Sequence, residues 1–290
     1  MGIGVVVGDM KYGLVAIDVD GTRVNPDQTV SPEVVDAVAE AEAAGIGACL
    51  ATGRSYAETV PVWRQLRLRG PYEPMVLIGG ALVAEPDTGR TLYQRTMPRL
   101  LACEVADALI EAGYSAMAIV DPWRHGVDYF FAESRDVEQA AGRWFDRMNV
   151  KVRRVGRLSE APDMPNPLRV SAVVEPAAAP QLAQRLAQQF DGRLNVQSIL
   201  APNYGLTIVE AFVSSASKLA GVIYVAQARK LGPGQIAAVG DDINDLSMIR
   251  GVGLGAAMPK APPSVRAAAA HVAEGGLAKF IRDLAAGKFE

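Results

Sequence analysis

The sequence has few cysteines, few histidines and almost no excess of charge of either sign. Its two cysteines, Cys49 and Cys103, stand far apart in 290 residues, without the spacing of metal ligands. This argues against a disulfide framework or a zinc site and is typical of a reducing compartment, so we expect a cytoplasmic protein. With 29 basic and 32 acidic residues, the net charge is −3, and no stripe of Lys or Arg indicates a nucleic-acid partner.

The sequence also lacks an apolar run long enough to cross a membrane. Residues 1–7 are apolar, but the run is short and no basic segment precedes it, so we expect neither a signal peptide nor a transmembrane helix. Half of the residues are hydrophobic, which is enough for the core of one large domain or two ordinary ones. These features predict a globular protein without a membrane partner, either a monomer or a homodimer.

Short apolar runs alternate with helical segments at both ends of the chain. Five of these runs are predicted strands, at 14–17, 46–51, 75–78, 236–239 and 252–257. A helix is predicted to begin after the capping hydroxyl of Ser31, with proline at its first position, and to end near Ala44; another is predicted at 218–231. Apolar runs of this kind suit strands that are buried on both faces, so the pattern predicts a doubly wound parallel sheet of the α/β class.

This alternation is interrupted in the middle of the chain. Two helices, each followed by a strand, are predicted at 99–112 with 116–120 and at 178–190 with 194–199. Three further strand-like runs lie at 128–131, 150–155 and 168–174. We therefore predict a core of residues 1–82 and 213–290, with an inserted α+β domain at 83–212.

Polar side chains follow three of the predicted core strands. In chain order they are Asp18 and Asp20, then Thr52, then Asp241, Asn244 and Asp245. Ligands of open α/β sheets bind beyond the carboxyl ends of the strands, so we expect these side chains to converge. Oxygen ligands without His or Cys indicate Mg²⁺. The sequence thus predicts a magnesium site at this edge of the sheet.

Four segments, in this order, resemble the motifs of the haloacid dehalogenase (HAD) superfamily. They are Asp18-Val19-Asp20-Gly21-Thr22, Ala51-Thr52-Gly53-Arg54, Ser217-Lys218 and Gly240-Asp241-Asp242-Ile243-Asn244-Asp245. Each alone is a weak signal, because paired acids and acidic helix starts are common. Along its whole length the chain is similar to the Cof-type sugar phosphatases, whose large type IIB cap is inserted after the third core strand. The resemblance implies a HAD-like Rossmannoid core and phosphatase activity.

The resemblance also implies a role for each matching residue. Asp18 is the expected nucleophile, and Asp20 the expected general acid and then base. The expected site of Mg²⁺ comprises Asp18, the backbone carbonyl of Asp20, Asp241, Asn244 and Asp245. The expected phosphate-binding groups are Thr52, Gly53, Lys218 and Asn244. These roles agree with the chemistry, because attack by a carboxylate on a phosphate dianion needs cations to offset the repulsion.

For three further residues, the sequence gives a less specific prediction of their contacts. Arg54, after the phosphate-binding Thr52, is expected either to contact substrate or to pair with an acid. Arg124 and His125 lie in a predicted polar loop at 121–125, together with Trp123, and are expected to contact the substrate. Three positions depart from the family pattern: Gly79 replaces Asn, Leu219 replaces Gly, and Lys260 replaces Asn.

The expected function is hydrolysis of a small soluble phosphorylated metabolite, such as a sugar phosphate, with Mg²⁺ as cofactor. A phosphomutase, which shares the aspartyl-phosphate on Asp18 but returns the phosphoryl group to a bound sugar, is the first alternative. A phosphate-accepting receiver domain also combines an acid cluster with Thr and Lys. Its acceptor, however, lies on a middle strand of a far shorter chain, so this alternative is less favoured.

Overall fold

The computed structural model describes residues 11–20, 29–68, 70–133, 145, 150–201 and 206–289. The chain divides into two compact units. The core unit contains the residues up to 88 together with those from 217 onward, and the cap unit contains residues 89–216. The predicted domain limits, after 82 and before 213, lie a few residues earlier. One reason is that Val83 belongs to strand β4 (Leu82–Ala84), which pairs with β3 (Met75–Leu77) in the core unit.

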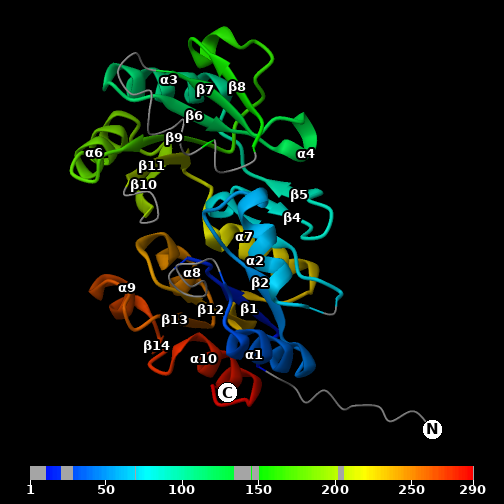
Figure 1. The fold of residues 1–290 in the computed structure, drawn as a ribbon. Helices are drawn as coiled ribbons and strands as arrows, with labels where there is room; N and C mark the ends of the chain where they lie inside the picture. The colour runs from blue at the N-terminus through cyan, green and yellow to red at the C-terminus, as the bar shows by residue number, and fades with distance from the viewer. Residues whose placement is uncertain are drawn as a thin grey trace. The chain divides into compact units, whose positions relative to one another are not determined.

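The core unit is built on a five-stranded sheet with the order β14-β13-β12-β1-β2 (Figure 1). All its strands are parallel: β1 (Leu14–Ile17), β2 (Gly47–Leu50), β12 (Ile236–Gly240), β13 (Leu254–Ala257) and β14 (His271–Val272). Beyond β2, Ala51 forms a parallel bridge to Val76 of β3. All four residues of β1 are buried, as expected for an apolar strand covered on both faces. The predicted α/β class is therefore confirmed.

Helices cover this sheet, and their bounds follow local sequence signals. They are α1 (Pro32–Ala43), α2 (Tyr56–Gln65), α7 (Lys218–Ala228), α8 (Leu246–Gly251), α9 (Pro263–Ala268) and α10 (Gly276–Ala285). Helix α1 begins with proline as predicted, but the Ser31 hydroxyl makes no capping hydrogen bond, which corrects that detail. Helix α2 has a full capping box between Ser55 and Glu58. Among the described residues, no helix has the length and apolar character needed to span a membrane.

The cap unit contains a six-stranded mixed sheet with the order β10-β11-β9-β6-β7-β8. Its strands are β6 (Ala116–Ile119), β7 (Tyr129–Ala132), β8 (Val152–Val155), β9 (Arg169–Val174), β10 (Leu194–Ala201) and β11 (Leu206–Val213), and β5 (Thr91–Gln94) lies outside this sheet. Helices α3 (Arg99–Glu111) and α6 (Ala179–Gln189) share one apolar core with alternate residues of β9, such as Val170 and Ala172. This arrangement confirms the predicted α+β cap.

One sequence expectation in the cap is wrong, and one strand was not predicted. The strand is β11, in which the buried Glu210 pairs with Arg169 of β9 and accepts a hydrogen bond from Gln197 (3.0 Å). Residues 121–125 do not form a loop but the single-turn helix α4 (Pro122–His125). The Asp121 carboxylate caps this turn by accepting a hydrogen bond from the amide of Trp123 (3.0 Å).

Candidate active site

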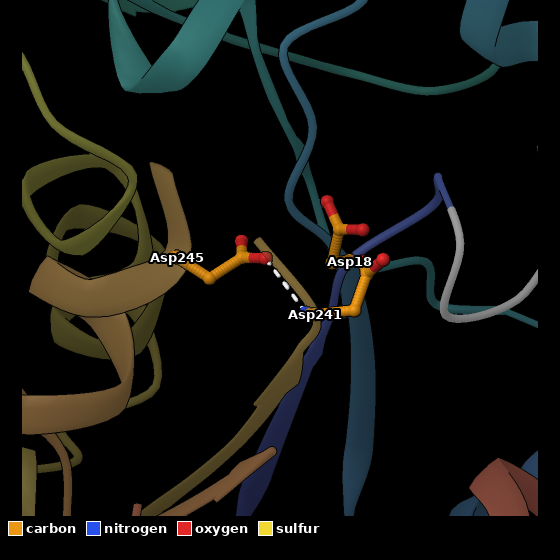
Figure 2. A group of neighbouring side chains, drawn as sticks. All are labelled: Asp18, Asp241 and Asp245. Carbon is orange, nitrogen blue, oxygen red and sulfur yellow. Dashed lines mark hydrogen bonds between the residues drawn. The ribbon is translucent and has the colours of Figure 1, made fainter. Parts of the chain in front are cut away.

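Three carboxylates from separate segments meet at the carboxyl end of the core sheet (Figure 2). Asp18 follows β1, Asp241 follows β12, and Asp245 ends the short 3-10 helix η5 (Ile243–Asp245). Each offers an oxygen within 4.8 Å of the others. Asp18 and Asp241 come together because β1 and β12 are parallel neighbours, and the amide of Asp18 donates to the carbonyl of Val239 (3.0 Å). The predicted convergence at the strand ends is therefore present for these acids.

Asp245 organises the loop after β12. Its side chain is completely buried, and its Oδ2 accepts hydrogen bonds from the amides of Asp241 (2.9 Å) and Asp242 (3.1 Å). Gly240 allows this arrangement, because a Cβ at that position would lie 2.4 Å from Cγ of Asp245. The carboxylate thus holds the backbone on which Asp241 is presented.

We expect Gly240→Ala to destabilise the protein by about 1–3 kcal/mol, because the added methyl group forces Asp245 away from the two amides. Gly234→Ala is the matched control, since a Cβ there meets nothing within 4 Å. Urea denaturation of both variants measures the difference. Equal stabilities would contradict this account of Gly240.

Lys218 joins two of the three carboxylates. As the first residue of α7, it is almost fully buried, and its Nζ donates to Oδ1 of Asp18 (2.6 Å) and to Oδ1 of Asp245 (2.6 Å). Oδ1 of Asn244 lies 3.4 Å from the same nitrogen. Burial by itself lowers the pKa of Lys218, but the charges of the two carboxylates outweigh it and the pKa lies above its ordinary value. The ammonium group is therefore a fixed positive charge in the site.

Close backbone contacts place Lys218 at the site. Ser217 caps α7 by accepting a hydrogen bond from the amide of Ala220 (3.2 Å). Gly80, with φ +90°, packs so tightly on the Ser217 carbonyl that a Cβ would lie 1.9 Å from its oxygen. Gly221 packs similarly on Val76. In the sequence, the Gly79-Gly80 pair marks only the end of a predicted strand and is the only local signal for this packing role of Gly80.

Only one of the two carboxylate oxygens of Asp18 has a hydrogen-bond partner among the described residues. Oδ1 is held by Lys218, whereas the buried Oδ2 has no hydrogen-bond partner among the described residues. Burial raises the pKa of Asp18 most, the charge of Asp245 raises it further, and Lys218 acts against both, so the pKa lies well above its ordinary value. A hard cation bound between Asp18 and Asp241 would give Oδ2 a partner and would offset the repulsion between the carboxylates. The donor set therefore fits Mg²⁺.

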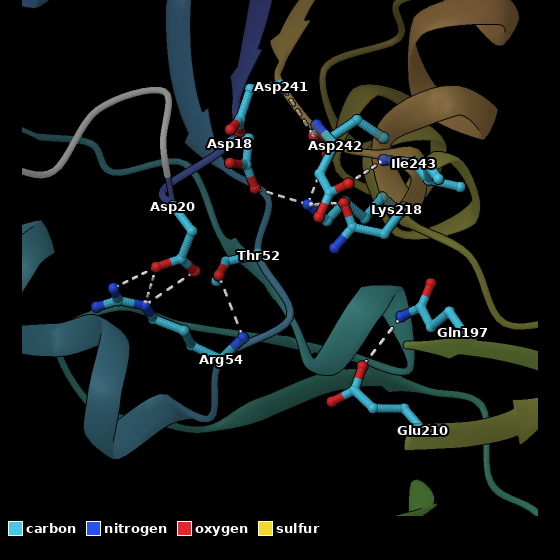
Figure 3. Close-up of polar contacts among 12 residues, drawn as sticks. Asp18, Asp20, Thr52, Arg54, Gln197, Glu210, Lys218, Asp241, Asp242 and Ile243 are labelled. Atoms are coloured by element: carbon cyan, nitrogen blue, oxygen red, sulfur yellow. Dashed lines mark hydrogen bonds and ion pairs between the residues drawn. The ribbon is translucent and has the colours of Figure 1, made fainter. Parts of the chain in front are cut away.

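A second group of residues lies beside the carboxylates (Figure 3). Thr52 is completely buried, and its Oγ1 accepts a hydrogen bond from the amide of Arg54 (3.1 Å). The guanidinium of Arg54 pairs with the carboxylate of Asp20, with Nε 2.9 Å from Oδ1 and 3.0 Å from Oδ2. Arg54 thus pairs with an acid, which is one of its two expected roles. The Asp20 carboxylate points to Arg54, which is compatible with the expected use of its backbone carbonyl toward a metal.

The other predicted substrate-binding residues lie in the turn after β2 and in the cap unit. Gly53 lies between Thr52 and Arg54 in the turn after β2. Arg124 and His125 belong to α4 in the cap unit, where Nε of Arg124 lies 3.2 Å from Oδ2 of Asp121.

The departures from the family pattern have structural counterparts. Gly79 has φ +61°, in the left-handed region that Asn also tolerates, so the backbone conformation does not depend on Asn. Leu219 occupies the space left by Gly251, where a Cβ would lie 2.3 Å from Cδ2 of Leu219. Lys260 is exposed in a turn after β13. None of the three alters the carboxylate group.

Comparison with known proteins identifies the family of this chain. A family model described as haloacid dehalogenase-like hydrolase matches residues 15–281. The chain therefore belongs to the haloacid dehalogenase-like hydrolases, which confirms the predicted family and, with relatives that are themselves phosphatases, the predicted enzyme class.

Two curated relatives and one solved structure illustrate the similarity. The 5-amino-6-(5-phospho-D-ribitylamino)uracil phosphatase YitU of Bacillus subtilis is 25% identical over 95% of this chain and 98% of its own. The pyridoxal phosphate phosphatase YbhA of Escherichia coli is 24% identical over 90% and 92% of the two chains. The HAD subclass IIB sugar phosphatase BT4131 has the same fold, with a TM-score of 0.74 at 18% identity, over 93% of this chain and 98% of that one.

Proposed function

We propose that this protein is a Mg²⁺-dependent phosphatase that hydrolyses phosphomonoesters of small metabolites through a covalent phosphoryl group on Asp18. The observation that carries the proposal is the state of the Asp18 carboxylate. It is buried at a strand end, one oxygen is held by the Lys218 ammonium, and the other has no hydrogen-bond partner among the described residues, beside Asp241. Such a carboxylate is built to meet a cation and an electrophile together.

Asp18 and Asp241 would hold the metal directly, together with the carbonyl of Asp20. Asp245 holds the loop that presents Asp241, and Asn244 would help to orient these ligands. When bound, Mg²⁺ offsets the negative charge of the phosphate and of the attacking carboxylate. Lys218 contributes a second positive charge at the same carboxylate. Thr52 and the Gly53 amide would bind the phosphate oxygens, with Asn244 and Lys218.

The chemistry requires two transfers. In the first, an oxygen of Asp18 attacks phosphorus, the bond from phosphorus to the leaving oxygen breaks, and Asp20 gives its proton to that oxygen. In the second, Asp20 takes a proton from a water molecule whose oxygen attacks phosphorus, and the bond between phosphorus and Asp18 breaks. Inorganic phosphate leaves and both carboxylates return to their starting state. The protein thereby replaces one difficult hydrolysis by two easier steps.

The names of the relatives support a substrate class. Two of them are named as phosphatases of pyridoxal phosphate and of 5-amino-6-(5-phospho-D-ribitylamino)uracil, and the structurally similar protein is named a sugar phosphatase. We infer a small, polar, hydroxyl-bearing phosphate ester for this protein. A screen of such esters with Mg²⁺, reading released phosphate, tests the proposal. If isomerised phosphate ester exceeds released phosphate, the protein is instead a phosphomutase.

We expect the cap helix α4 to contribute to selectivity. Trp123 is 54% exposed next to Arg124 and His125, a ring with nearby hydrogen-bonding groups that suits a polyhydroxy ligand. Arg124→Ala and His125→Ala should therefore change kcat/KM unequally across the substrate panel, with p-nitrophenyl phosphate nearly unaffected. Arg193→Ala, which removes an exposed ion pair elsewhere in the cap, is the control. If both α4 variants leave every kcat/KM unchanged, this helix is not the specificity element.

A further inference from the structure

Arg54 contacts the carboxylate of Asp20 through the edge of its guanidinium formed by Nε and one Nη. Nε of Arg54 reaches both carboxylate oxygens, at 2.9 and 3.0 Å, and one Nη also contacts Oδ1 (Figure 3). The Arg54 side chain is 15% exposed, whereas that of Asp20 is 56% exposed. A largely buried cation thus holds an exposed carboxylate through one edge of the planar guanidinium.

The backbone of Arg54 is itself fixed on both sides. Its amide donates to Oγ1 of Thr52 (3.1 Å), and its carbonyl accepts from the amide of Ile78 (3.0 Å). Ile78 has φ +50°, a left-handed conformation that a β-branched residue rarely adopts. Strained residues persist where the surrounding structure determines them, and here Gly79 donates to the Thr52 carbonyl (3.0 Å) in the same turn. The guanidinium therefore projects from an anchored point.

We infer that Arg54 is a positioning residue for the acid and base Asp20, and that it does not bind the substrate phosphate. The inference rests on the proposed function. It extends that function to a residue outside the group formed by Asp18, Asp241, Asp245 and Lys218. The edge formed by Nε and Nη, one of the two edges of a guanidinium that can bind phosphate oxygens in a bidentate way, is occupied by Asp20. Oδ1 of Asp20 accepts from both Nε and one Nη, whereas Oδ2 accepts only from Nε among the described residues, so Oδ2 has a second lone pair for the proton that Asp20 transfers.

Positioning matters because an exposed carboxylate on a turn otherwise samples several rotamers. A general acid contributes about 10²–10⁴-fold to a rate only when it lies within hydrogen-bond reach of the leaving oxygen. The need for that proton depends on the substrate: an alkoxide leaves poorly without it, whereas p-nitrophenolate leaves as an anion. Loss of Arg54 should therefore lower kcat/KM for alkyl phosphates and change it little for p-nitrophenyl phosphate.

The first experiment compares kcat/KM of Arg54→Met for an alkyl phosphate and for p-nitrophenyl phosphate, since kcat/KM covers the steps up to departure of the leaving group. We expect a fall of about 100-fold for the alkyl ester and less than about 3-fold for the aryl ester. Arg282→Met is the matched control. It removes a similar contact, of Nε with both oxygens of Glu40 at 3.1 and 3.3 Å, between α10 and α1. It should leave both values unchanged.

The second experiment is a double-mutant cycle with Asp20→Asn, measured with the alkyl ester. If Arg54 acts through Asp20, Arg54→Met adds no further loss in the Asp20→Asn background, and calorimetry gives the same Kd for inorganic phosphate with and without Arg54. Equal losses for both esters, or a Kd for phosphate raised about tenfold or more, would overturn the inference in favour of phosphate binding. A wild-type protein that releases phosphate from no ester would instead overturn the proposed function, and this inference with it.

Discussion

Asp18→Asn is expected to lower phosphate release by about 10⁴-fold or more. The amide oxygen of Asn is a poor nucleophile, and no neighbouring carboxylate replaces it: Asp245 is fully buried and committed to Lys218 and to the amides of Asp241 and Asp242. Asp36→Asn, on an exposed position of α1, is the control and should retain full activity. Phosphate release from the best ester of the panel measures both variants.

The fold should survive this substitution. Asn has nearly the same shape as Asp, and its side-chain oxygen can accept the hydrogen bond that Lys218 gives to Oδ1 of Asp18. Lys218 keeps its contact with Asp245 (2.6 Å). Thermal unfolding should therefore give a Tm close to that of the wild type. Substantial activity in a pure Asp18→Asn preparation would exclude the covalent mechanism.

Exhaustive chelation of divalent cations is expected to abolish activity, and added Mg²⁺ to restore it. The buried Oδ2 of Asp18 and the nearby carboxylate of Asp241 are hard oxygen donors, and within the described part of the chain no His or Cys belongs to this group. Ca²⁺ should not support turnover, because its longer bonds and higher coordination number let Asp18 chelate the ion and lose its alignment with phosphorus.

A binding measurement separates this prediction from activity. Mg²⁺ at about 100 times its Kd should stabilise the folded protein by about 2.7 kcal/mol, visible as a higher Tm. Asp241→Asn should weaken that stabilisation, while Asp36→Asn should not. Full activity after chelation, or a Tm insensitive to Mg²⁺ in the wild type, would contradict a magnesium site between Asp18 and Asp241.

Several elements of the fold were predictable because their signals are local. The buried run at 14–17 and the proline and glycine that bound α1 act within a few residues, and the structure reproduces β1 and α1 closely. Strand β11 was missed for the opposite reason. A carboxylate in the middle of a strand argues against burial, and only its partner Arg169 on the neighbouring strand makes Glu210 acceptable there.

The candidate site shows the same division. The acids at the ends of β1 and β12 were predictable from motif order, since parallel strands bring their carboxyl ends to one edge. The pairing of Arg54 with Asp20 was not, because it depends on the strained turn at Ile78 that fixes the Arg54 backbone. The importance of Gly80 was equally hidden, since the Ser217 carbonyl that crowds it is distant in the chain.

The sequence by itself determined the parallel α/β core, the inserted α+β segment and the residue types of the site, because hydrophobic periodicity and strand-end motifs are properties of short segments. Only the tertiary structure decided which of those residues form hydrogen bonds and ion pairs with one another. Lys218 and Asp18 are 200 positions apart, yet their contact leaves one oxygen of Asp18 without a partner among the described residues, and Arg54 takes the carboxylate of Asp20. Such contacts depend on the order of strands in the sheet and on close backbone packing, which no local pattern encodes.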